Sequence, residues 1–61
     1  MDPQANLKKQ AEISQQIIDL WDKCDDDDEL LKYYSPQIAD LAIELAELSK
    51  AYTDWKSSGG F

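Results

Sequence analysis

Apolar residues recur at helical spacing over residues 6–24. At about 100° per residue, half of the helical wheel collects the apolar side chains of this stretch. They are Leu7, Ala11, Ile13, Ile17, Ile18, Leu20, Trp21 and Cys24. Asn6, Gln10 and Ser14 are the polar residues that interrupt this half. The pattern predicts an amphipathic helix whose apolar face is wider than packing against a single neighbouring helix requires.

The ends of this first helix are marked by local signals. Asp2 followed by Pro3 suits an N-cap and a first helical residue, since proline lacks the N–H that would be unsatisfied there. The acidic run from Asp25 to Glu29 ends the pattern, because consecutive aspartates repel one another and are poor helix formers. We therefore expect helix one over about residues 3–24, followed by an acidic connection.

A second periodic segment follows this connection. Its apolar positions recur at intervals of three and four residues, which is typical of a heptad seam. They are Leu31, Tyr34, Ile38, Leu41, Leu45, Leu48, Tyr52 and Trp55. A parallel stripe of small side chains, which would let another helix approach closely, consists of Ala39, Ala42, Ala46 and Ser49. Two stripes predict two neighbouring helices.

The start of the second helix has two interpretations. Ser35 and Pro36 suit an N-cap and first helical residue, which predicts a connection over 25–35, helix two over about 36–56 and a frayed tail over 57–61. Asp26 with Glu29 resembles a capping box, which predicts a short helical turn before Ser35. Because the heptad register runs through Pro36, a single kinked helix is the alternative.

These elements predict an all-α protein with a single helical-hairpin domain over residues 1–61. The helices match in length and pair antiparallel, and the surplus apolar surface favours a homodimer that forms a four-helix bundle. This architecture is similar to that of the plasmid copy-control hairpin dimers. The expected core and self-association residues are Ile13, Ile17, Ile18, Trp21, Ile38, Leu41, Ala42, Leu45, Ala46, Leu48, Tyr52 and Trp55. Tyr33 is expected to be exposed.

Composition and charge narrow the classes of function. The net charge is −7, with 13 acidic residues, six lysines and no arginine, which opposes direct binding to nucleic acid or to anionic membranes. A basic protein partner fits this charge better. A lone cysteine and the absence of an apolar leader predict a cytoplasmic protein. Without histidine, the usual nucleophile–histidine catalytic sites are excluded, so we expect no enzyme and no cofactor.

The carboxylates are the remaining candidates for chemistry. Asp19 and Asp22 on helix one, with Asp40, Glu44 and Glu47 on helix two, have the i, i+3 and i, i+4 spacing that could hold a divalent cation between helices. The stretch from Asp40 to Glu47 resembles the Glu-x-x-Glu helix of the all-α nucleotide pyrophosphohydrolases, which implies Mg²⁺-dependent hydrolysis. These carboxylates project away from the apolar seam, so we expect a solvated face and treat them as weak metal candidates.

Three functions are therefore weighed. The leading hypothesis is a non-enzymatic protein–protein interaction module that self-associates through its apolar helix faces. The second is an acidic nucleic-acid mimic, in which the carboxylates of residues 19–29 and 40–47 occupy the basic groove of a DNA- or RNA-binding protein. The third is a Mg²⁺-dependent nucleotide hydrolase that is assembled only in the oligomer.

Overall fold

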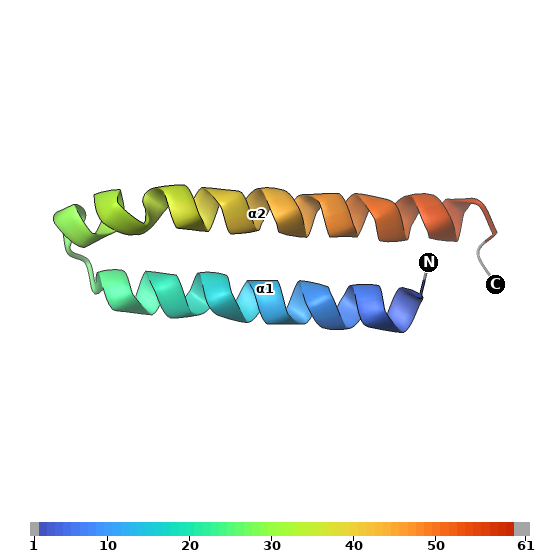
Figure 1. The fold of residues 1–61 in the computed structure, drawn as a ribbon, viewed down its shortest axis with the longest axis horizontal. Coiled ribbons are helices and arrows are strands. Elements are labelled where there is room, and N and C mark those ends of the chain that lie inside the picture. The colour runs from blue at the N-terminus through green and yellow to red at the C-terminus, as the bar shows by residue number, and fades with distance from the viewer. Residues whose placement is uncertain (1, 60–61) are drawn as a thin grey trace.

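A computed structural model describes residues 2–59 of the chain, which form two antiparallel helices (Figure 1). Helix α1 spans Pro3–Cys24 and α2 spans Asp28–Ser57. They lie side by side over the length of an elongated body that measures 46 × 15 × 12 Å. The acidic turn lies at one end of the hairpin, and the start of α1 and the end of α2 lie at the other (Figure 1). The predicted all-α helical hairpin is thus confirmed.

Aspartate side chains cap the N-termini of both helices. The Asp2 carboxylate accepts hydrogen bonds from the backbone N–H groups of Gln4 and Ala5, at 3.0 and 3.3 Å. The Asp27 carboxylate does the same for Glu29 and Leu30, at 2.9 and 3.3 Å. Each cap satisfies two of the backbone donors that a helix N-terminus leaves unpaired. The predicted capping box at Asp26 is therefore wrong, since the cap of α2 is one residue later.

Helix α2 passes through Pro36 without a break, so the predicted connection over 25–35 and the helix start at residue 36 are wrong. The alternative of a single helix through the proline is confirmed. The connection is three residues long, and Ser35 is an ordinary residue within the helix. Leu31 and Tyr34, which precede the proline, are half-buried like the seam residues that follow it. The packing of this first part of α2 against α1 offsets the hydrogen bond that Pro36 cannot donate.

The core lies along one narrow stripe of α1. Among the described residues, Asn6, Ile13, Leu20 and Cys24 are buried, and their spacing follows intervals of seven, seven and four residues. Pro3, Gln10 and Ile17 fill the intervening seam positions and are half-buried. A single neighbouring helix can cover only about 100° of the 180° apolar face, so the rest of that face stays outside the core.

The seam of α2 is covered only in part. All eight residues of its predicted heptad seam are half-buried, and no described residue of this helix is fully buried. The accessible surface of 4691 Å² exceeds the roughly 4,000 Å² typical of a compact protein of 7.0 kDa. The radius of gyration of 14.3 Å likewise exceeds the value of about 10.5 Å expected for a globule of this length.

The second helix ends close to the predicted boundary. Ser57 is its last residue, and the Gly59 N–H donates a hydrogen bond of 3.2 Å to the Lys56 carbonyl oxygen. Gly59 has a φ of 76°, in the left-handed region that favours glycine after a helix. Residues 60–61 of the predicted tail lie outside the described residues. Within the described range, neither helix carries an apolar stretch that could cross a bilayer.

Candidate self-association surface

Large apolar side chains remain exposed along α1, beside the core. Leu7, Ile18 and Trp21 are 47%, 51% and 52% exposed. With Ala11 and Ser14 they form a second heptad stripe, at intervals of four, three, four and three residues. The expectation that Ile18 and Trp21 belong to the hairpin core is therefore wrong for the single chain. Their exposure makes this stripe the strongest candidate for contact with another molecule.

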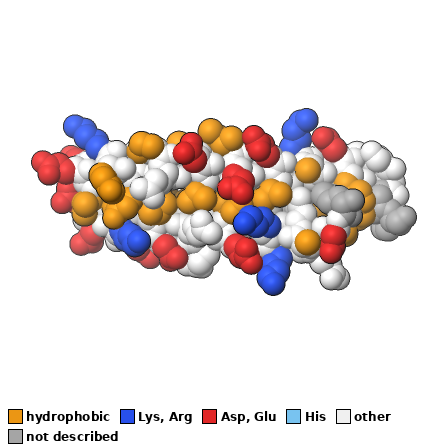
Figure 2. Space-filling view, in the orientation of Figure 1, with side chains coloured by type: hydrophobic (Ala, Val, Ile, Leu, Met, Phe, Trp, Pro, Cys, Tyr) orange, Lys and Arg blue, Asp and Glu red, His pale blue; other side chains and the backbone are white. Residues whose placement is uncertain are grey.

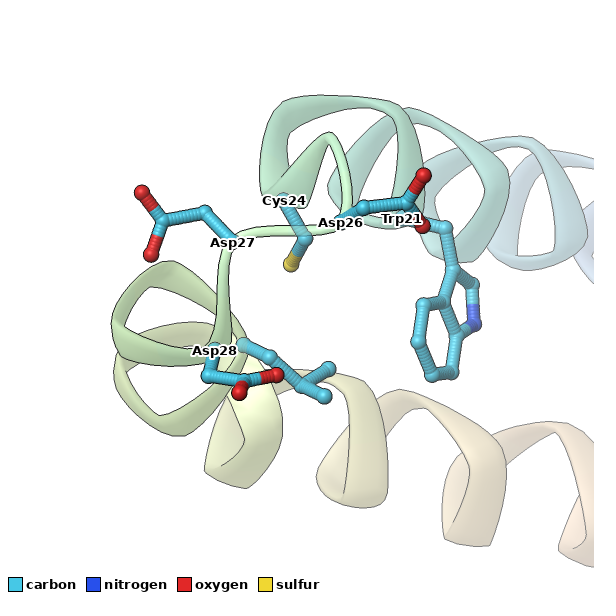
Figure 3. Close-up of a pocket in the computed structure, with 6 residues that line it drawn as sticks. Trp21, Cys24, Asp26, Asp27 and Asp28 are labelled. Atoms are coloured by element: carbon cyan, nitrogen blue, oxygen red, sulfur yellow. The ribbon is translucent and has the colours of Figure 1, made fainter.

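The small residues of α2 lie on the same side of the hairpin as this stripe. Trp21 and Leu31 line one hollow between the helices, together with Cys24 and three aspartates of the turn. Figure 3 shows the Trp21 indole at this hollow. Ser49 follows Leu31 by 18 residues, which is five helical turns, so the two side chains project in nearly the same direction. The small stripe therefore runs along the Trp21 side of the hairpin. We call the two stripes together the apolar flank, which consists of Leu7, Ala11, Ser14, Ile18, Trp21, Ala39, Ala42, Ala46 and Ser49.

The hollow on the opposite side of the hairpin is mostly polar. A second hollow between the helices is lined by Gln16, Asp19, Leu20, Lys23, Gln37 and Leu41. Only two of these six side chains are apolar, and both belong to the seam residues that pack between the helices. We call this side the polar flank. Large apolar side chains of α2 are exposed as well, namely Leu30, Tyr33 and Ile43, at 38%, 68% and 58%. The apolar flank differs in carrying exposed large apolar residues in a continuous stripe along α1, which favours it for association.

The space-filling view shows how apolar surface is distributed on one face of the molecule (Figure 2). Hydrophobic side chains form a band along the line where the helices meet, and acidic and basic side chains are scattered along both sides of that band and, near the middle of the hairpin, across it. Pairing of the two helices therefore leaves apolar atoms accessible along much of the hairpin. This view agrees with the partial burial of the α2 seam.

The sequence-predicted self-association residues fall into three groups. Ile13 is 1% exposed and belongs to the core of the hairpin. The half-buried group lies along the seam and consists of Ile17, Ile38, Leu41, Leu45, Leu48, Tyr52 and Trp55. The exposed group lies on the apolar flank and consists of Ile18, Trp21, Ala42 and Ala46. Of these residues, only Ile13 is fully covered within one chain.

One core residue was missed because it is polar. Asn6 is only 7% exposed, and its amide Nδ2 donates a hydrogen bond of 3.0 Å to the backbone carbonyl oxygen of Leu48. Its Oδ1 accepts one of 2.6 Å from Gln10 Nε2. The spacing of seven residues from Asn6 to Ile13 and from Ile13 to Leu20 is the sequence signal that could have found it.

The acidic residues do not form a metal site within the described part of one chain. No group of three or more Asp, Glu or Cys side chains is arranged there to hold an ion. The weak candidates Asp19, Asp22, Asp40, Glu44 and Glu47 are all exposed. Within one chain these carboxylates are therefore not arranged to bind a metal ion together. The hydrolase that would be assembled only in the oligomer stays a prediction.

Cys24 occupies the turn end of the core. It is 3% exposed, as expected for a cysteine that acts as a small buried hydrophobe. Its Sγ atom and the indole of Trp21 point into the same hollow, whereas the carboxylate of Asp27 points away from it (Figure 3). The thiol is thus part of the packing between the helices.

Comparison of the chain with protein-family models, with curated proteins and with solved structures finds no match. The functional proposal therefore depends on the surface described above.

Proposed function

We propose that this chain is a non-enzymatic protein–protein interaction module that self-associates through its apolar flank. The observation that carries the proposal is the exposure of Leu7, Ile18 and Trp21 along one stripe. Burying half-exposed aliphatic and aromatic side chains against another apolar surface is favourable at about 25 cal/mol per Å². Large exposed apolar surfaces on small proteins typically mark interaction sites.

The size of the hairpin is compatible with a stable dimer. A flat face of 46 by 15 Å has an area on the order of 700 Å², and side-chain relief adds accessible area to it. A standard protein–protein interface buries about 800 Å² on each partner. One long side of the hairpin therefore provides about the area that a specific dimer needs.

Self-association through the apolar flank would leave the outer side of the acidic turn accessible to a different molecule. All seven carboxylates between residues 19 and 29 are exposed. Such a concentration of negative charge attracts basic surfaces and accelerates encounters with them. We propose a basic protein as the second partner, reached through the turn end of the hairpin.

Sedimentation equilibrium of the wild type and of Ile18→Glu tests the proposal. The wild type is expected to sediment at twice the 7.0 kDa chain mass at micromolar concentration. Ile18 is half-exposed in the single chain, so the substitution should preserve the hairpin but place a charge in the dimer interface. The dimer is expected to weaken by at least about 100-fold.

Gln16→Glu is the matched control, because it adds the same charge two residues away on the polar flank. It should leave the dimer within about threefold of the wild type, since an added surface charge has a small effect. Circular dichroism verifies that both variants stay helical. A monomeric wild type, or equal losses in the two variants, would contradict the proposal.

A further inference from the structure

We infer that the occupant of the apolar flank is a second copy of this chain docked antiparallel, so that the acidic turn of each hairpin lies beside the terminal end of the other. This inference rests on the proposed self-association and specifies its geometry. In this arrangement α1 packs against the partner's α1 and α2 against the partner's α2, around a two-fold axis across the middle of the hairpin.

The stripe of apolar residues on α1 is symmetric about Ser14. Leu7 and Trp21 each lie seven residues, about two helical turns, from Ser14. When two copies of α1 cross antiparallel at Ser14, Leu7 of one copy faces the Trp21 position of the other. Ala11 then lies close to the Ile18 position, so that a small side chain meets a large one.

The small stripe of α2 has the same symmetry. Ala42 and Ala46 lie two residues on either side of Glu44, and Ala39 and Ser49 lie five residues on either side. Two antiparallel copies of α2 that cross at this point bring their small stripes into contact. Such surfaces let helices approach to about 8 Å, the lower end of the usual range.

The two centres of symmetry lie at similar heights along the hairpin. The bond from Asn6 to the Leu48 carbonyl fixes the alignment of the helices. Counting eight residues forward from Asn6 reaches Ser14, and counting eight back from Leu48 reaches Asp40, within about one helical turn of Glu44. The two centres are therefore about 6 Å apart along the hairpin, and a two-fold axis midway between them lies about 3 Å from each. Each stripe then pairs about four residues away from its own symmetric register.

The charge distribution selects the antiparallel arrangement over the parallel one. The turn end, residues 19–32, carries seven carboxylates and two lysines. The terminal end, residues 2–12 and 44–56, carries five carboxylates and four lysines. A parallel dimer would place the two strongly acidic ends side by side, whereas the antiparallel dimer pairs each with an almost neutral end.

Distances between spin labels test the orientation. We would label Glu29→Cys, an exposed position at the start of α2, in a Cys24→Ala background. A two-fold axis midway between the two centres crosses α2 near Ala42, 13 residues from Glu29, so the antiparallel dimer separates the two labels by about 40 Å at 1.5 Å per residue. In a parallel dimer both labels lie at the same end, within about 30 Å of each other.

A mixture of chains labelled singly at Glu29→Cys or Asp54→Cys gives the reciprocal measurement. The antiparallel dimer brings the unlike labels within about 30 Å, and the parallel dimer separates them by about 40 Å or more. If Cys24→Ala weakens the hairpin, the buried native thiol is retained and single labelling is verified by mass. Short like-label distances in a dimer would overturn the orientation alone, and a monomeric wild type would overturn the proposed function as well.

Discussion

The side-chain amide of Asn6 donates a hydrogen bond of 3.0 Å to the backbone carbonyl oxygen of Leu48, which joins α1 to α2 across 42 residues of sequence. A buried asparagine at a seam position is a known device for fixing the alignment of paired helices, because only one register satisfies its amide. In this hairpin the amide is satisfied on both sides, since Gln10 donates to its oxygen.

Replacing Asn6 by alanine is expected to lower the free energy of unfolding by about 1 kcal/mol, the usual net contribution of one hydrogen bond in a protein. The substitution also removes the group that fixes the register. Chemical denaturation monitored by circular dichroism measures the change. Gln16→Ala, at an exposed position of the same helix, is the control and should leave stability within about 0.5 kcal/mol. Equal effects of the two substitutions would contradict a role for the amide.

Much of the hairpin could be predicted from sequence because its signals are local. The Asp2 cap, Pro3 and the spacing of the apolar residues predicted α1 as the structure has it. The seam of α2 was predicted residue by residue, since the period of a heptad survives even where burial is only partial. The small exposed stripe of α2 was found in the same way.

Two features could not be read from local signals. At Pro36 the local signals disagreed, because Ser35 and the proline favoured a new helix start whereas the heptad register favoured one continuous helix. The apolar face of α1 spans about 180° and includes both Leu20 and Trp21. The sequence pattern therefore did not show which of these residues packs against α2. That choice depends on the position of α2 and on the contact between Asn6 and Leu48.

Replacing Pro36 by alanine is expected to stabilise the hairpin by about 1–3 kcal/mol. An alanine supplies the missing N–H donor to the preceding turn and relieves the clash of the proline ring with the carbonyl four residues earlier. Thermal unfolding should show a higher midpoint for the variant. Ser35→Ala, at the neighbouring exposed position, is the control and is expected to change stability by about 0.5 kcal/mol or less. A loss of stability in Pro36→Ala would show that the proline is needed for the path of α2.

The backbone conformation of the turn also lowers the stability of the hairpin. Asp25 and Asp26 have φ values of 43° and 58°, in the left-handed region that side chains with a Cβ rarely adopt. Glycine adopts this region without the steric penalty, so Asp26→Gly is expected to raise the free energy of unfolding by about 0.5–1 kcal/mol. Asp26→Asn is the matched control, because it removes the same charge but keeps the Cβ. If Asp26→Gly and Asp26→Asn raised the free energy of unfolding equally, the gain would come from the lost charge and not from the backbone conformation.

Self-association should tighten as salt is added. Each copy carries a net charge of −7, so two copies repel one another, and this repulsion extends further at low ionic strength. Between about 20 and about 300 mM NaCl the Debye length falls from about 20 to about 6 Å, and the dissociation constant of the dimer is expected to fall by about threefold or more. Sedimentation equilibrium at several salt concentrations measures the trend. Binding of a basic partner to the acidic turn is expected to weaken as salt is added, because salt screens the attraction between opposite charges. The same holds if the chain acts as a nucleic-acid mimic. A dimer that dissociates on adding salt would therefore indicate that charge pairing, and not the apolar flank, holds the copies together.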